Sequence, residues 1–127
     1  IMVLSLFPDI QANIFEHALD APELKGVVMR SFGSGNAPQQ AWLIETLKKA
    51  SQRGVSIVNI SQCVTGFVEM GRYDTGYQLK GTGVISGQDC TVEAAVTKLM
   101  YLYGRYGDDT KTIRELLSIP LAGEFQI

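Results

Sequence analysis

The sequence has few of the residues that mark metal sites and nucleic-acid-binding surfaces. It contains one histidine and two cysteines, and the cysteines, Cys63 and Cys90, lie too far apart for a CxxC motif. We therefore expect reduced thiols, no zinc site and no bound metal. The 11 basic residues do not outnumber the 13 acidic residues, so the formal net charge of -2 provides no positive field to hold nucleic acid.

Long hydrophobic runs are also missing. The longest uncharged stretch, residues 54–68, contains serine, asparagine, glutamine and threonine side chains. It is shorter than the roughly 20 apolar residues that span a bilayer, so we expect no membrane anchor. The chain opens on Ile1 without the basic start or small-residue cleavage site of a signal peptide. Because this residue already leads into a predicted strand, we expect the chain to be part of a larger protein.

The composition that remains is typical of one globular domain, with 46% hydrophobic and 19% charged residues. Short apolar runs alternate with segments in which apolar residues recur at helical spacing. Strands are predicted over residues 2–7, 26–30, 54–60 and 84–85, and helices over residues 10–19, 38–50, 91–103 and 110–117. The alternation predicts an α/β fold, with a small, mostly parallel sheet of about four strands and helices on both faces. Such a three-layer domain is similar to the flavodoxin and Rossmann folds.

Helical spacing also predicts which side chains face the core. In the first helix, Ile14 and Phe15 fall on the apolar side, and in the third helix Leu99 and Met100 do. Trp42 lies off the apolar side of its own helix. We expect it to be a packed aromatic or a contact with another subunit rather than a platform for a cofactor.

Ligands of parallel α/β sheets bind beyond the carboxyl ends of the strands. Two polar segments, residues 30–38 and 59–65, follow consecutive predicted strands. Gly33 and Gly35 do not belong to a dinucleotide fingerprint, because its third glycine would fall on Pro38. A tight turn between strand and helix is enough to explain these two glycines. Alternatively, the turn lets an anion reach the free N–H groups at the start of the next helix, and Arg30 donates two parallel hydrogen bonds to the same anion.

A nucleophilic cysteine is not supported. Cys63 would need a histidine base, and His17 lies on the polar side of the first helix, far from any strand end. We expect His17 to be a solvated surface residue and Cys63 a small neighbour of a strand end. Glu69 and Asp74 lie in a glycine-rich segment where a ligand could bind, but they form no recognisable acid–base pair.

Several segments together resemble one family. Residues 30–38 read RSFGSGNAP, 59–63 read NISQC, 71–76 read GRYDTG and 91–99 read TVEAAVTKL. In this order and at these intervals, followed by the closing residues 121–124, they resemble the C-terminal domain of bacterial type I, cytoplasmic L-asparaginases.

The resemblance implies that the catalytic residues lie in a second domain. In that family a larger N-terminal domain carries the threonine nucleophile in a Thr-Gly-Gly-Thr-type motif, and no such motif occurs here. Residues 1–127 would then be the small C-terminal domain, without catalytic residues of its own. The parent protein would hydrolyse L-asparagine to L-aspartate and ammonia, without a cofactor, as a cytoplasmic homodimer or homotetramer. Its active site would form at the boundary of two subunits.

The resemblance also implies a second, regulatory asparagine site. Matched motif by motif, its residues would be Arg30, Ser61, Gln62 and Cys63, where Ser61 replaces the threonine of many members. Asn36 is a further candidate for a ligand contact. Two alternatives remain open: a free-standing module that binds an amino acid, and an asparaginase-like subunit that works with an amidotransferase.

Overall fold

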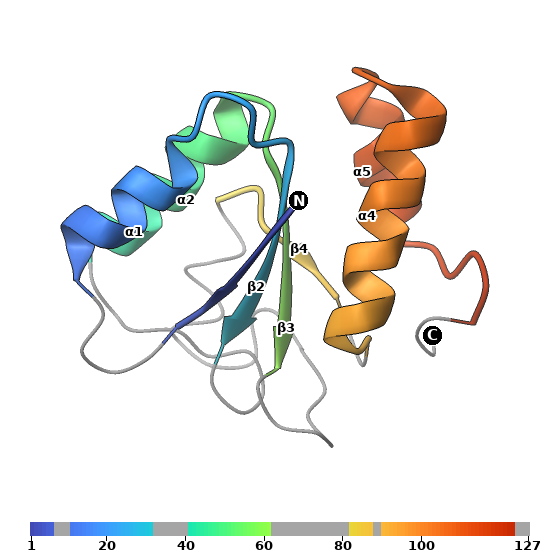
Figure 1. Ribbon diagram of the computed structural model, residues 1–127, viewed down its shortest axis with the longest axis horizontal. Coiled ribbons are helices and arrows are strands. Elements are labelled where there is room, and N and C mark those ends of the chain that lie inside the picture. The colour runs from blue at the N-terminus through green and yellow to red at the C-terminus, as the bar shows by residue number, and fades with distance from the viewer. Residues whose placement is uncertain (7–10, 32–40, 62–81, 88–89, 124–127) are drawn as a thin grey trace.

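Strands and helices alternate along the chain as the sequence predicts (Figure 1). The structure is a computed structural model and describes residues 1–6, 11–31, 41–61, 82–87 and 90–123. Its elements are β1 (Met2–Ser5), α1 (Ala12–Leu19), β2 (Gly26–Ser31), α2 (Ala41–Gln52), β3 (Ser56–Ser61), β4 (Ile85–Ser86), α4 (Val92–Tyr106) and α5 (Thr110–Leu117).

The strands form one four-stranded sheet, in the order β1-β2-β3-β4, and every pairing is parallel. The third strand begins at Ser56 rather than at residue 54. Gly54 has a φ of 99°, and this left-handed conformation closes the turn that leads from α2 into the strand. The structure ends β1 at Ser5, and Phe7, the last residue of the predicted strand, lies outside the described residues.

Helices cover the sheet on both faces. Val27 and Met29 of β2 belong to the core beneath α1 and α2, whereas Val28 belongs to the core beneath α4 and α5. This division follows from the alternation of side chains along a strand. Figure 1 shows α1 and α2 on one side of the sheet and α4 and α5 on the other. The predicted three-layer α/β fold is confirmed.

Two predictions of buried side chains are wrong. Ile14 is 64% exposed and Met100 is 61% exposed, although their neighbours Phe15 and Leu99 are fully buried. Adjacent residues of a helix differ by about 100° around its axis. In α4, Leu102 is buried together with Leu99, so the buried side of the helix is centred away from Met100.

Side-chain caps begin the last two helices. The Thr91 hydroxyl accepts a hydrogen bond from the Ala94 amide at 3.1 Å. The Asp109 carboxylate accepts hydrogen bonds from the amide and the hydroxyl of Thr112, at 3.3 and 2.7 Å. These hydrogen bonds, the side-chain bond foremost, lower the pKa of Asp109 below its ordinary value. In the described part of the chain, no helix is both long and apolar enough to cross a membrane.

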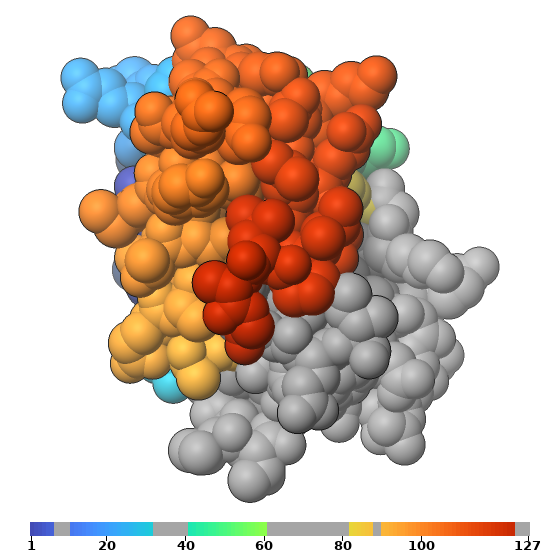
Figure 2. Space-filling view, turned by 90° about the vertical axis from the view of Figure 1, so that its right-hand side faces the viewer, coloured from blue at the N-terminus to red at the C-terminus, as the bar shows by residue number. Residues whose placement is uncertain are grey.

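A buried lysine attaches the segment after α5 to α4. The side chain of Lys98 is on α4, and the residue is only 8% exposed. Its Nζ donates to the carbonyl of Leu117 at 3.2 Å and to the carbonyl of Ile119 at 2.6 Å. Figure 2 shows the red segment that follows α5 lying across the surface of α4 and α5. The ammonium group therefore satisfies carbonyl groups that the end of α5 leaves without helical partners.

Candidate strand-end ligand site

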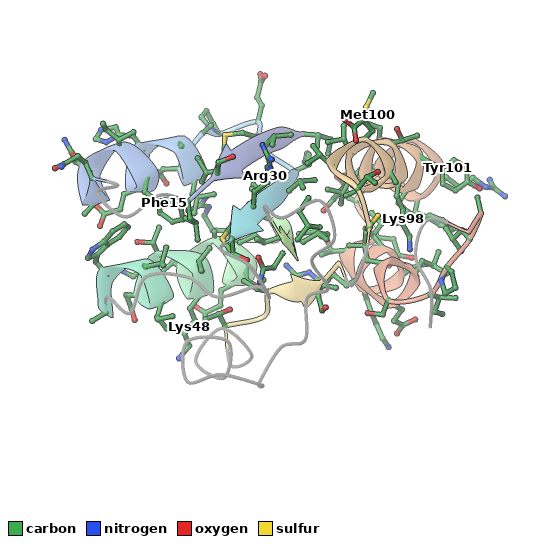
Figure 3. The ribbon with its side chains drawn as sticks, turned by 90° about the horizontal axis from the view of Figure 1, so that it is seen from below. Phe15, Arg30, Lys48, Lys98, Met100 and Tyr101 are labelled. Carbon is green, nitrogen blue, oxygen red and sulfur yellow. The ribbon has the colours of Figure 1, made fainter. Side chains whose placement is uncertain are left out.

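Strands β2 and β3 end side by side, at the edge of the sheet where the sequence predicts a ligand site. Arg30 is paired with Ile60 and Ser31 with Ser61 in the parallel register. Adjacent strands are about 4.8 Å apart, so the backbones of Arg30 and Ser61 are close neighbours although 31 residues separate them in sequence. Figure 3 views the molecule from this end and shows Arg30 between the α1–α2 layer and the α4–α5 layer.

Arg30 lies on the second-to-last residue of β2 and is half-buried. Its Nε atom is shielded from solvent, and its carbonyl accepts a hydrogen bond from the Leu6 amide at 2.9 Å. Its strand partners are Ser5 on β1 and Ile60 on β3. In this position the sheet fixes the backbone of Arg30, and the Nε atom of its guanidinium group is desolvated. Both properties strengthen bidentate hydrogen bonds to a carboxylate.

Buried polar groups surround this edge of the sheet. Ser31 is fully buried, and its hydroxyl donates to the Ile60 carbonyl at 3.3 Å. Asn59 is also fully buried, and its backbone carbonyl accepts from the Gly87 amide at 2.8 Å. A Cβ atom on Gly87 would lie 2.5 Å from the Ile60 side chain, so only glycine allows the chain after β4 to approach β3 this closely.

Ser31 and Asn59 were not among the predicted site residues, although each lies in one of the motifs. Ser31 gave no sequence signal, because it follows Arg30 at the end of the predicted strand of residues 26–30. Asn59 gave one, because it is a polar side chain between the apolar residues Val58 and Ile60. Polar residues at such positions are buried only when they hydrogen-bond within the fold or with a ligand.

The structure brings together only part of the predicted site. Arg30 and the backbone of Ser61 meet at the strand ends. The other predicted contacts, Asn36, Gln62 and Cys63, lie outside the described residues, as do Glu69 and Asp74.

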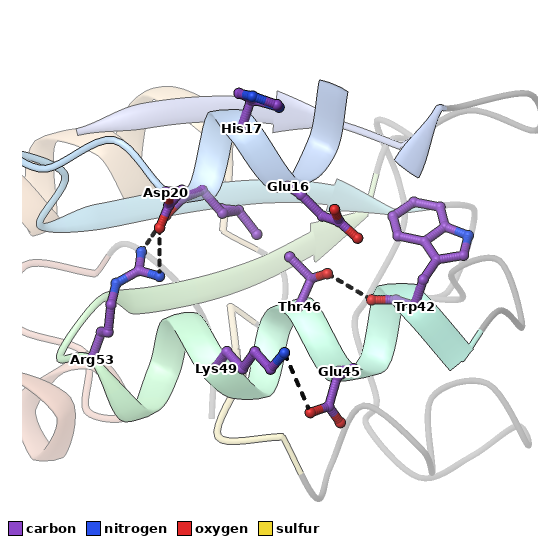
Figure 4. A pocket seen from close by; sticks show the side chains of 9 residues that line it. Glu16, His17, Asp20, Trp42, Glu45, Thr46, Lys49 and Arg53 are labelled. Carbon is purple, nitrogen blue, oxygen red and sulfur yellow. Dashed lines mark hydrogen bonds and ion pairs between the residues drawn. The ribbon is translucent and has the colours of Figure 1, made fainter. Parts of the chain in front are cut away.

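A second polar surface lies between α1 and α2, away from the strand ends (Figure 4). Here a groove of about 480 Å³ includes His17, which is exposed as predicted. Charges in the groove pair with each other, for example Arg53 with Asp20 at 3.2 Å. Trp42 packs edge-on against Phe15, with ring centroids 5.5 Å apart, so it is a packed aromatic, one of the two predicted roles. No ligand is needed to explain these contacts.

Metal-binding groups do not cluster in the described ranges. Among those residues, no group of three or more histidine, cysteine or acidic side chains could hold a metal ion. Cys90 is partly buried and packs beside the core beneath α4 and α5. At the strand ends, Arg30 supplies a positive charge and several hydrogen-bond donors.

The chain is similar to several curated proteins over nearly its whole length. It is 45% identical over 122 residues to L-asparaginase 1 of Escherichia coli (strain K12), covering 96% of this chain and 36% of that protein. It is 44% identical to the 60 kDa lysophospholipase of Homo sapiens, covering 96% of this chain and 21% of that protein. Identity to a glutamyl-tRNA(Gln) amidotransferase subunit of Methanopyrus kandleri is 33%, covering 99% of this chain and 27% of that protein. The chain thus spans roughly a third of these proteins or less.

Solved structures have the same fold. L-asparaginase I from Vibrio cholerae matches with a TM-score of 0.92 and 38% identity, over 99% of this chain and 38% of that one. A probable cytoplasmic L-asparaginase from Campylobacter jejuni matches with a TM-score of 0.67 and 25% identity, over 91% of this chain and 33% of that one.

Nearly the whole chain matches one known protein family. Residues 1–117 match the family described as Glutaminase/Asparaginase C-terminal domain. This match covers all the strands and helices described above, and it confirms the resemblance that the sequence motifs indicated. The chain therefore belongs to the glutaminase/asparaginase C-terminal domain family.

Proposed function

We propose that the protein is a type I L-asparaginase, of which residues 1–127 are the small C-terminal domain. The whole protein would hydrolyse L-asparagine to L-aspartate and ammonia. The observation that carries this proposal is the 45% identity to Escherichia coli L-asparaginase 1 across 96% of the chain. The TM-score of 0.92 to Vibrio cholerae L-asparaginase I also supports it.

The catalytic nucleophile would come from an N-terminal domain of the same protein. This chain contains no Thr-Gly-Gly-Thr motif, so it would not hydrolyse asparagine by itself. The C-terminal domain would contribute to subunit association, as a homodimer or homotetramer. It would also close an active site at the boundary between subunits. The protein would act in the cytoplasm, in keeping with its similarity to a probable cytoplasmic L-asparaginase.

The strand ends of this domain would bind L-asparagine as an effector. Arg30 would hold the α-carboxylate with two parallel hydrogen bonds. Hydroxyl and amide groups of Ser61, Gln62 and Asn36 would meet the amino and amide groups of the ligand, with Cys63 beside them. Two observations support this role: the ends of β2 and β3 are adjacent, and Arg30 is half-buried there.

Steady-state kinetics of the full-length protein would test both parts of this proposal. Ammonia release from asparagine is expected for the full protein and not for residues 1–127 alone. Arg30→Ala is expected to raise the asparagine concentration needed for activation about tenfold or more, because it removes a charged hydrogen-bonded pair. Arg30→Lys keeps the charge without the bidentate fork, and Lys111→Ala changes an exposed residue of α5 as a control. Unchanged activation in Arg30→Ala would refute the effector site but not the hydrolytic activity.

A second candidate function is that of one component of an amidotransferase. The 33% identity to the glutamyl-tRNA(Gln) amidotransferase component of Methanopyrus kandleri favours it. Such a component would act together with a partner protein on glutamyl-tRNA(Gln), whereas an asparaginase needs only free asparagine. Ammonia release by the purified full-length protein alone would therefore favour the asparaginase. A free-standing amino-acid-binding module would bind asparagine in calorimetry without releasing ammonia.

A further inference from the structure

Two hydrogen bonds hold the end of β3 from opposite sides. From β2, the Ser31 hydroxyl donates to the Ile60 carbonyl at 3.3 Å. From the chain directly after β4, the Gly87 amide donates to the Asn59 carbonyl at 2.8 Å. The strand order β2-β3-β4 places these two donors on either side of β3. Two successive carbonyl groups are therefore held in both directions, directly before Ser61.

Gly87 provides space rather than an unusual backbone conformation. Its φ is not in the left-handed region. A Cβ atom there would lie 2.5 Å from Cγ2 of Ile60, 2.9 Å from Cγ1 of Val58 and 3.1 Å from the carbonyl oxygen of Asn59. Ile60 and Val58 are both buried, so neither side chain can turn aside into solvent. A side chain at position 87 would therefore displace the chain after β4, the end of β3, or both.

Ser31 links the two strand ends that would bind the ligand. It is the last residue of β2, it follows Arg30 directly, and it pairs with Ser61 in the parallel register. The residue is fully buried, where a hydroxyl group is retained at low cost only if it is hydrogen-bonded. Its bond to Ile60 reaches the residue just before Ser61. The strand that carries Arg30 is thereby attached to the strand that carries Ser61.

We propose that Ser31 and Gly87 are positioning residues of the strand-end site, which hold the backbone of Ser61 at a fixed distance from Arg30. One amino acid can contact both strand ends only if their spacing matches its length. A site that is ordered before the ligand arrives loses less binding free energy to ordering. The inference rests on the effector function proposed above, and it adds two residues that would act without touching the ligand.

The amino ends of β3 and β4 provide matched controls. Ser56 begins β3 and is also fully buried, and its hydroxyl shares a hydrogen bond with the Tyr103 hydroxyl at 2.8 Å. Gly83 precedes β4, and a Cβ atom there would lie 2.2 Å from the side-chain oxygen of Ser51. Alanine at position 56 or 83 should lower stability without moving the carboxyl ends of β2 and β3. These variants therefore separate a loss of stability from a loss of positioning.

Ammonia release by the full-length protein at increasing asparagine concentration tests the proposal. Gly87→Ala is expected to raise the concentration for half-activation about fivefold, and Ser31→Ala about threefold. The rate at saturating asparagine should stay within about twofold, whereas a loss of folded protein would lower that rate without moving half-activation. Ser56→Ala and Gly83→Ala should leave half-activation unchanged. Ser31→Ala removes a single oxygen atom, so it keeps the test available if Gly87→Ala does not fold.

A second substitution tests the contact at Gly87 itself. Ile60→Leu removes the methyl group nearest to position 87 and nearly conserves the volume of the side chain. Combined with Gly87→Ala, it should recover at least half of the shift on a logarithmic scale, and strictly additive effects would contradict the role of this contact.

Comparison with Arg30→Ala separates this inference from the effector function. If Arg30→Ala shifts half-activation while Ser31→Ala and Gly87→Ala behave like the two controls, the positioning role is refuted and the effector site stands. If Arg30→Ala shifts nothing, the effector site is refuted, and the positioning role with it.

Discussion

Replacing Lys98 by methionine tests how the end of the chain is held. Methionine has a similar length and shape but cannot donate hydrogen bonds. The carbonyls of Leu117 and Ile119, which now accept from the ammonium group at 3.2 and 2.6 Å, would lose that donor. We expect α5 and the segment after it to open more often, while the sheet remains intact.

The expected magnitude follows from two opposing contributions. Hydrogen bonds to a charged group are worth about 1.5–3 kcal/mol each, and Lys98 makes two of them. Burying an ammonium group at 8% exposure costs several kcal/mol, and this cost disappears with methionine. The net loss is about 2 kcal/mol, which corresponds to an approximately 30-fold increase in local opening.

Hydrogen exchange followed by mass spectrometry measures this opening in peptides that cover residues 110–123. Lys111→Met is the matched control, because Lys111 is on α5 and exposed. Peptides from β2 and β3 should exchange at the same rate in both variants. If Lys98→Met and Lys111→Met differ by less than about threefold, the buried lysine does not stabilise the segment and the reasoning fails.

Further substitutions test the core, a turn and a cap. Phe15→Ala should lower the free energy of unfolding by about 3–5 kcal/mol in urea titrations, whereas Ile14→Ala should change it by less than about 0.5 kcal/mol, because only Phe15 is buried. Gly83→Ala should lower the melting temperature, since the new methyl group would lie 2.2 Å from a hydroxyl oxygen of α2 and φ is 93°; an unchanged melting temperature would contradict the turn geometry. Because the pKa of Asp109 is lowered in the folded state, its stabilising effect should be present above its ordinary value of 3.8 and disappear as the pH falls through the folded value. The stability difference from Asp109→Asn should therefore shrink in acid, and a constant difference would refute the cap.

The fold was predictable because its signals are local. Apolar runs at residues 26–30 and 54–60 identify two strands without reference to the rest of the chain. The cap of α4 is local as well, because the Thr91 hydroxyl accepts from the amide of Ala94, three residues along the chain. Alternation of strands with helices then limits the topology to a parallel sheet covered on both faces.

The candidate site was predictable only in part. Arg30 and Ser61 follow from the motifs, and the register of β2 and β3 brings their backbones together. Contacts from Gln62, Cys63 and Asn36 remain predictions, because these residues lie outside the described part of the chain. Ser31 was missed because its burial depends on the neighbouring strand, whose carbonyl accepts its hydroxyl bond.

The sequence by itself determined the strands and helices, the absence of a nucleophile motif and the family resemblance, because each of these depends on residues close together in the chain. Tertiary structure decided which side of each helix is buried. Met100 is exposed and Lys98 is buried, against the simple apolar pattern of α4. That outcome depends on the carbonyls that α5 and the following segment bring to Lys98, and on the packing of Leu102 against the sheet side of the helix. Such contacts join residues distant in sequence, so they exist only once the chain has folded.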